Sequence, residues 1–275
     1  MDSSLLPLLP PALVIAGYLA YRFYRNWSHR RLISAPFPES WRSILASNNA
    51  VYPRLSAAER ERLHQVIKLF LDEKTYYGCA GLQITDEIRL TIAADACLLL
   101  LHRQGPVYPG LTAILVYPTG FSAKREEYYD DGTVGHEARH MLGESWDNGR
   151  IVLAWDAAAH GASDFSDGEN VILHEFAHQL DSHSGDTNGA PVLRNNSYRS
   201  WARVFSENFE DLQERVDKGQ PTVMDDYGAT NPAEFFAVAT ETFFEEPHAL
   251  HKHRPELFEQ LQGYYRCDPR LWQER

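Results

Sequence analysis

Cysteine and positive charge are both scarce in this sequence. Its three cysteines, Cys79, Cys97 and Cys267, lie far apart, which excludes a disulfide framework and a thiolate zinc site. Only 26 lysines and arginines stand against 38 aspartates and glutamates, and the resulting net charge of −12 argues against a nucleic-acid-binding surface. Internal repeats and low-complexity tracts are also missing. With 44% hydrophobic residues, the 275-residue chain has the composition of a globular protein.

Charged residues are missing from residues 3–21, an apolar run of about the length that spans a bilayer. The arginines that follow, beginning with Arg22, contrast with Asp2 before the run. Positive-inside reasoning therefore predicts a single-pass anchor in the inner (cytoplasmic) membrane, formed by residues 1–31, and a cytoplasmic domain over residues 32–275. A cleavable signal peptide carries its positive charge on the other side of the run.

Prolines at positions 7, 10 and 11 disrupt the first half of such a membrane helix. The alternative is a hydrophobic hairpin, or a helix that packs on the domain of a cytoplasmic protein.

Hydrophobic periodicity in the rest of the chain predicts an α+β fold, in which a small mixed sheet is followed by a mostly helical C-terminal part. Apolar, β-branched runs predict strands over residues 111–117 and 150–155, and the more polar residues 121–129 predict a partner strand nearer an edge of the sheet. A capping box of Ser56 and Glu59 begins one helix, and helical spacing predicts others over residues 86–102, 156–160, 198–216, 233–244 and 255–266.

The most informative motif lies at residues 174–178 and reads H-E-x-x-H. In a helix, histidines four residues apart share one face, so both imidazoles can bind a single Zn²⁺. Glu175 is then placed to take a proton from a zinc-activated water. We expect Asp167 or Ser166 to cap this helix and Glu169 to add negative charge to its first turn. A buried helix with two hydrogen-bonded histidines is the alternative.

A second match to the same pattern runs from His136 to His140. Nearby glycines and the lack of apolar periodicity predict a surface loop or a helix of about two turns. Arg139 would place a positive charge between the ligands, which disfavours a dication. We therefore expect one Zn²⁺ per chain, bound at His174 and His178 and not here.

Catalytic zinc needs a third protein ligand and an open position. His183 is close in sequence, but the extended motif that uses such a histidine requires glycine and histidine where Asp181 and Ser184 stand. Glu234 is the better candidate, because it lies in the first turn of an apolar helix, where a carboxylate otherwise faces solvent. Its alternative role is to stabilise the helix end.

Two further carboxylates can accept the second N–H of a ligating imidazole and thereby fix its tautomer. Asp181 follows His174 by seven residues on the same helix face, and Glu241 follows Glu234 by seven. Each can equally be a solvated charge.

Residues 174–181, together with residues 227–237 (Y-G-A-T-N-P-A-E-F-F-A), resemble the Mlc titration factor A family of zinc peptidases. The second segment also resembles the catalytic domain of anthrax lethal factor. The resemblance covers residues from about 55 to 266 and implies a zincin-like peptidase domain within residues 32–275. It implies that His174, His178 and Glu234 bind zinc, that Glu175 is the general base, and that Tyr227 donates to the oxyanion of the tetrahedral intermediate.

The sequence leaves two functions in play. The first is a zinc metallopeptidase that cleaves a peptide substrate and, as family members are described, resembles an aminopeptidase. The alternative is a binding protein that sequesters a transcriptional repressor of the Mlc type, with a structural or vestigial zinc site. An intact Glu175 favours the peptidase, because a structural zinc site needs no base.

Overall fold

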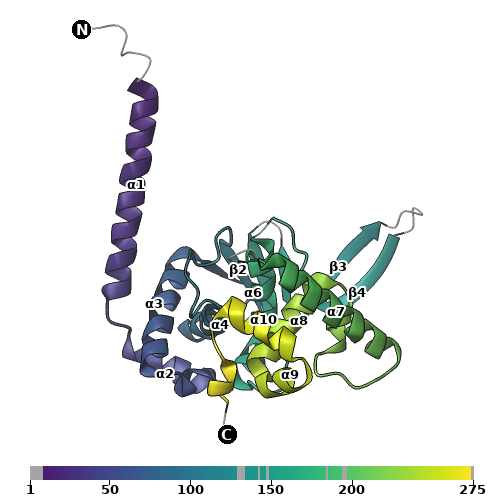
Figure 1. Cartoon of the computed structure of the whole chain (residues 1–275). Coiled ribbons are helices and arrows are strands. Elements are labelled where there is room, and N and C mark those ends of the chain that lie inside the picture. Colours follow the sequence, from purple (N-terminus) through teal and green to yellow (C-terminus); the bar gives the residue numbers. More distant parts are fainter. Residues whose placement is uncertain are drawn as a thin grey trace. The chain divides into compact units, whose positions relative to one another are not determined.

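The computed structural model describes residues 9–128, 134–141, 143–146, 149–183, 185–193 and 197–273. The chain divides into two compact units, residues 1–37 and residues 38–275. Helix α1 (Leu9–Ser34) belongs to the first unit, and all other elements belong to the second (Figure 1).

The expected N-terminal transmembrane anchor is wrong. The charge-free part of α1 runs only from Leu9 to Tyr21. It is shorter than the roughly 20 apolar residues that span a bilayer. Arg22 and Arg25 follow within the same helix. In the part of the chain that the structure describes, no helix combines the length and the apolar character needed to cross a membrane.

The second unit contains a four-stranded sheet with the strand order β1-β2-β6-β5. Strands β1 (Thr75–Gly78), β2 (Ala113–Tyr117) and β6 (Arg150–Ala154) are parallel, and β5 (Gly143–Trp146) runs antiparallel to β6 at one edge. The two central strands, β2 and β6, were expected from their apolar runs, and alternate side chains of β2 are fully buried. The short strand β1 was not expected, because most of its residues are exposed and no apolar run marks it.

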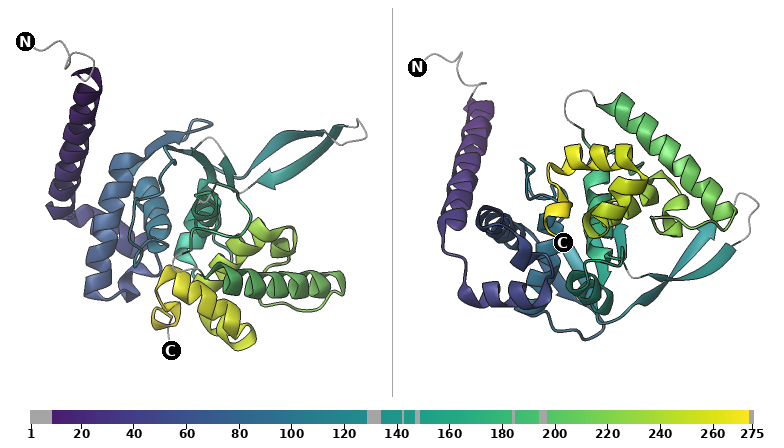
Figure 2. Two further views of the ribbon diagram at one scale, coloured as in Figure 1. Left: turned by 45° about the horizontal axis from the view of Figure 1, so that its top comes forward. Right: turned by 60° about the horizontal axis from the view of Figure 1, so that its bottom comes forward.

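Helices form most of the second unit and surround this sheet (Figures 1 and 2). They are α2 (Glu39–Asn48), α3 (Ala57–Glu73), α4 (Asp86–Leu98), α5 (Trp155–Ser163), α6 (Val171–Ser182), α7 (Tyr198–Asp217), α8 (Pro232–Glu245), α9 (Pro247–His253) and α10 (Pro255–Tyr265), with short 3₁₀ turns η2 (Tyr52–Arg54), η3 (Asp226–Ala229) and η4 (Pro269–Leu271). Helix α4 is shorter than predicted, and α2 lies in the stretch that contained no predicted element.

Helix α6, which carries the first H-E-x-x-H motif, is largely buried. It packs against α8 and β5 and also contacts α4, α5 and β6. Phe176 of α6 meets the rings of Phe70 and Tyr108, and all three side chains are buried. Apolar packing on most sides fixes this helix, so the polar residues on its remaining face have defined positions.

The second H-E-x-x-H match lies on strand β4 (Val134–Met141), not on a loop or a helix. Strand β4 pairs with β3 (Phe121–Tyr128) as an antiparallel two-stranded ribbon, which extends away from the sheet and helices of this unit (Figures 1 and 2). In a strand, residues four apart are separated by about 13 Å along the chain. This backbone separates His136 and His140 too widely for both to bind one ion.

Candidate metal centre

The helix that carries the first motif begins at Asn170, not at the residues expected to cap it. The side-chain Oδ1 of Asn170 accepts hydrogen bonds from the backbone N–H groups of Ile172 and Leu173, at 3.1 and 3.0 Å. Asp167 and Ser166 lie too early in the chain to fill this role, and no acidic residue occupies the first turn. Asparagine is a favoured N-cap residue, and its position directly before the apolar run was the available signal.

A second capped helix, α8, brings Glu234 to the same place. Asn231 accepts hydrogen bonds from the backbone N–H groups of Ala233 and Glu234, and Pro232 occupies the first helical position. Because α8 packs along α6, the first turn of α8 lies beside the motif. Two segments that are far apart in the sequence therefore lie side by side in the fold.

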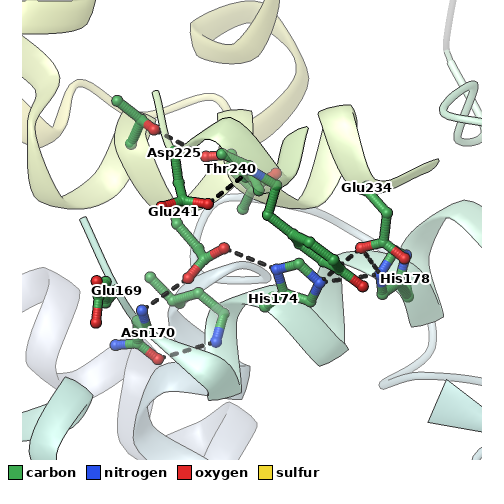
Figure 3. A network of polar contacts seen from close by, with 12 residues as sticks. Glu169, Asn170, His174, His178, Asp225, Glu234, Thr240 and Glu241 are labelled. Atoms are coloured by element: carbon green, nitrogen blue, oxygen red, sulfur yellow. Dashed lines mark hydrogen bonds and ion pairs between the residues drawn. The ribbon is translucent and has the colours of Figure 1, made fainter. Parts of the chain in front are cut away.

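Three side-chain atoms converge at this contact (Figure 3). The Nε2 atoms of His174 and His178 lie 3.2 Å apart, and the Oε2 atom of Glu234 lies 3.0 Å from the first and 3.2 Å from the second. The side chains are largely buried, with exposed fractions of 14%, 10% and 18%. Within the described residues, this is the group of histidine, cysteine and acidic side chains arranged to hold a metal ion.

The spacing of these atoms fits a tetrahedral ion. Ligand atoms bonded to such an ion at 2.0–2.2 Å lie roughly 3.3–3.6 Å from one another. The observed separations of 3.0–3.2 Å are only slightly shorter. Two imidazoles and one carboxylate are also a donor set that catalytic zinc sites use. The residues present therefore fit a zinc ion, which would require small outward movements of the side chains.

The surrounding charges support the same conclusion. Burial opposes protonation of His174, but the carboxylates of Glu241 and Glu234 outweigh it and raise the pKa of this imidazole. Burial of Glu234 is likewise outweighed by hydrogen bonds from the two histidines, so the pKa of its carboxyl falls well below the usual value. Glu234 is thus held as a carboxylate, and a cation at this point would compete with the proton on His174.

Of the two carboxylates expected to contact a ligating imidazole, Glu241 does so. Its Oε1 atom lies 2.7 Å from Nδ1 of His174, so it holds the imidazole with Nε2 turned toward Glu234 and His178 (Figure 3). Asp181 has another role, because its Oδ2 atom accepts a hydrogen bond from the backbone of Gly189 at 2.6 Å.

The remaining predicted residues lie at different distances from this centre. Glu175 is next to His174 on α6 and is 5% exposed. Tyr227 lies in η3, directly before α8, and its ring centroid is 5.9 Å from that of His174. Its side chain is exposed, with an exposed fraction of 44%. His183, the rejected ligand candidate, is the exposed residue that ends α6 and does not join the metal-binding group.

Two residues behind the centre were not found from the sequence. Asn170 lies between Glu241 and Asp95 and is hydrogen-bonded to both. Asp95 comes from the middle of α4, and its place as the one charged residue between Leu90 and Leu101 was the available signal that it is buried. Asp95 is fully buried in the fold, where α4 packs against α2, α3, α5 and α6.

Known proteins resemble most of this chain, including the residues of the candidate metal centre. Residues 24–266 match the family described as glucose-regulated metallo-peptidase M90. A Synechocystis protein whose name assigns it no activity is 41% identical over 271 residues, which are 95% of this chain and 98% of the relative. The Mlc titration factor A of Klebsiella pneumoniae is 32% identical over 232 residues, covering 83% and 86% of the two chains. That of Pectobacterium atrosepticum is 35% identical over 219 residues, covering 78% and 82%.

Proposed function

Because the chain belongs to the glucose-regulated metallo-peptidase M90 family, we propose that it is a zinc-dependent peptidase with Glu175 as general base. The observation that carries the proposal is the convergence of His174, His178 and Glu234 within 3.2 Å of one another. One zinc ion per chain would be held by these three side chains. Imidazole nitrogen and carboxylate oxygen in a tetrahedral arrangement favour zinc over magnesium or calcium, which prefer oxygen ligands alone.

Glu175 carries the proton transfers in this proposal. When bound, zinc supplies a Lewis acid that lowers the pKa of a water molecule and polarises the peptide carbonyl. The Glu175 carboxylate takes a proton from the attacking water and then donates it to the leaving amine. Its place beside His174 on a buried helix supports this role, because the rigid helix fixes the distance between base and ligands.

Tyr227 is the proposed donor to the oxyanion. Its ring lies beside His174, and its hydroxyl belongs to an exposed side chain that a bound substrate can reach. A hydrogen bond from this hydroxyl would strengthen as negative charge develops on the carbonyl oxygen. The short 3₁₀ turn that carries Tyr227 is fixed by Asp225, whose side chain accepts from the Tyr227 backbone N–H at 2.7 Å.

An extended peptide is the substrate class that the surroundings favour. Strand β5 stands at the edge of the sheet and packs against α6. An edge strand offers unpaired backbone groups with which an extended peptide can form an added strand. We propose aminopeptidase-like specificity from the resemblance to the Mlc titration factor A family.

The decisive experiment compares the wild-type protein with Glu175→Gln in zinc content and in turnover of amino-acid p-nitroanilides. We expect the variant to retain zinc and to lose about 10²–10⁴-fold in activity, the usual contribution of a general base. A parallel assay with N-acetylated peptides separates cleavage at a free N-terminus from internal cleavage. Near-normal turnover by Glu175→Gln would remove this residue from the mechanism.

The names of the relatives favour a second, compatible function. Two of the matching proteins are named Mlc titration factor A, so we propose that this chain also binds a repressor of the Mlc type. The test is a DNA-binding titration with purified Mlc repressor, in which added protein should release the repressor from its operator. Glu175→Gln should release it equally well. A repressor that stays on DNA at a large molar excess of the protein would exclude this function.

A further inference from the structure

Asn170 makes three kinds of hydrogen bond at the start of the motif helix, and it is fully buried. Its Oδ1 atom caps the helix, as described above. Its backbone N–H donates to Oε2 of Glu241 at 2.7 Å (Figure 3). Its side-chain Nδ2 donates to Oδ2 of Asp95 at 3.1 Å. One residue thus joins the helix start, the carboxylate behind His174 and an acid from another helix.

Glu241 is held at both oxygen atoms by this arrangement. Oε2 accepts from the backbone of Asn170, and Oε1 lies 2.7 Å from Nδ1 of His174. A carboxylate fixed at one oxygen can turn about that bond, whereas one fixed at both cannot. The orientation of the His174 ring therefore depends on where the backbone of Asn170 lies.

Asp95 decides which way the Asn170 amide faces. Asp95 is fully buried, and its second oxygen accepts from Nδ2 of Asn49 at 2.5 Å. If the Asn170 amide were reversed, its NH₂ group would meet the helix N–H groups and its oxygen would meet the Asp95 carboxylate. The first contact would face donor with donor and the second acceptor with acceptor. Asp95 therefore holds the amide in its capping orientation.

A simple N-cap does not require such an acid. Serine, threonine or aspartate caps a helix with no partner behind it, and a buried carboxylate is costly even when it is hydrogen-bonded. Burial raises the pKa of Asp95 to about 6, although hydrogen bonds from Asn170 and Asn49 oppose the shift. An acid buried at this cost, where a simple cap needs none, points to a role in placing Asn170 and the residues in front of it.

We propose that Asn170 is a positioning residue for the metal centre: oriented by Asp95, it fixes Glu241 and through it the His174 imidazole. The inference rests on the proposed zinc site. It assigns to Asp95, which does not contact the ligands, an effect on metal affinity that passes through two hydrogen-bonded neighbours.

Exchanging the two polar groups provides the sharpest test. In Asp95→Asn alone, the new amide cannot accept from both Asn49 and Asn170, so one pair of donors faces each other. In Asn170→Asp alone, two carboxylates face each other, although the cap is kept. In the double variant, the amide at position 95 accepts from Asn49 and donates to the carboxylate at position 170, which still caps the helix. The hydrogen bonds that join positions 49, 95 and 170 to one another and to the start of the helix are then restored.

The readouts are zinc affinity, measured by competition with a chromophoric chelator, and the visible spectrum of the cobalt(II)-loaded protein, which reports ligand geometry. We expect each single variant to weaken zinc binding by about tenfold, the lower end of the 10–100-fold range for groups that orient metal ligands. Each should also alter the cobalt spectrum, and the double variant should recover most of both properties.

A matched control separates positioning from loss of stability. Leu63→Ala removes a buried side chain on α3 and should destabilise the fold by about 2–5 kcal/mol. It should leave zinc affinity and the cobalt spectrum unchanged. If the single variants lose only stability, as this control does, or if the double variant shows no recovery, the inference is overturned. A wild-type protein that binds no zinc would overturn both this inference and the proposed function, whereas an active Glu175→Gln variant would overturn only the latter.

Discussion

Glu245, near the end of α8, should make the stability of this protein fall as pH rises. Its side chain is buried with an exposed fraction of 2%, and Oε2 accepts from the backbone N–H of Gly168 at 2.9 Å. Burial, reinforced by the negative charges of Glu241 and Asp167, raises the pKa of Glu245 to about 10. The folded protein thus keeps this carboxyl protonated at neutral pH, whereas the unfolded chain ionises it.

The sign of the effect follows from this difference. Because the folded pKa lies above the unfolded one, the contribution to stability is complete below about pH 4.5 and is lost as pH rises toward 10. One released proton corresponds to about 1.4 kcal/mol per pH unit. Between roughly pH 6 and pH 9 this amounts to about 4 kcal/mol, a large part of the stability of a typical domain.

Glu245→Gln removes the ionisation and should remove this pH dependence. The glutamine oxygen can still accept from Gly168. Its NH₂ group, however, loses its hydrogen bonds to water on folding and gains no acceptor in their place, which costs about 1–3 kcal/mol at every pH. The absolute stability at one pH is therefore less informative than the slope. Urea unfolding of metal-free protein across this pH range measures the slope without interference from metal binding.

The free energy of unfolding of Glu245→Gln, relative to wild type, should rise by about 1.4 kcal/mol per pH unit. Glu210→Gln, on the exposed face of α7, serves as the control and should follow the wild-type curve. Parallel curves for wild type and Glu245→Gln would show that Glu245 is already ionised in the folded protein, and would refute the reasoning.

Four further outcomes are expected. Glu234→Ala should lose zinc affinity, measured by metal analysis after dialysis, because a carboxylate ligand is gone; full occupancy would reject Glu234 as a ligand. Tyr227→Phe should keep zinc but lower kcat by about 10²–10³-fold, and an unchanged kcat would return this residue to a packing role. His136→Ala should leave zinc content unchanged, since β4 places its motif on a strand. Gly161→Ala should lower the urea midpoint by an equivalent of about 1–3 kcal/mol, because its Cβ would lie 3.0 Å from the Cα atom of Asn170; an unaltered midpoint would show that α5 can shift.

The residues that form the candidate metal cluster could be predicted from sequence because their signals are local. Two histidines at helical spacing and a glutamate after Asn231-Pro232 each lie in a short pattern with a fixed geometry. The pairing of Glu234 with the motif rested on the unusual place of this carboxylate in an apolar helix and on the family resemblance, not on any periodicity. The apolar strands β2 and β6 were predictable for the same local reason, since β6 is buried on both faces and β2 is buried on one face and half-buried on the other.

The polar residues behind the cluster could not be predicted in this way. The apolar run around Asp95 predicts its burial, but its partners Asn49 and Asn170 come from distant segments, which only the packing of α4 against α2, α3, α5 and α6 brings together. The second H-E-x-x-H match shows the converse error, because the same letters occupy strand β4 when their neighbours favour pairing with β3. The prediction of a membrane anchor was wrong because Arg22 and Arg25 lie in the same helix, α1, as the apolar residues.

The two helices that supply the proposed ligands are far apart in the chain, so an ion bound between them would also have a mechanical role. His178 and Glu234 are separated by 56 residues, so an ion that joins them closes a loop containing the whole of α7. By analogy with a covalent cross-link, closing a loop of this length in the unfolded chain corresponds to about 4 kcal/mol. An ion that takes part in catalysis would thus also stabilise the fold as a cross-link. Its removal would loosen α7 before it disturbed α3.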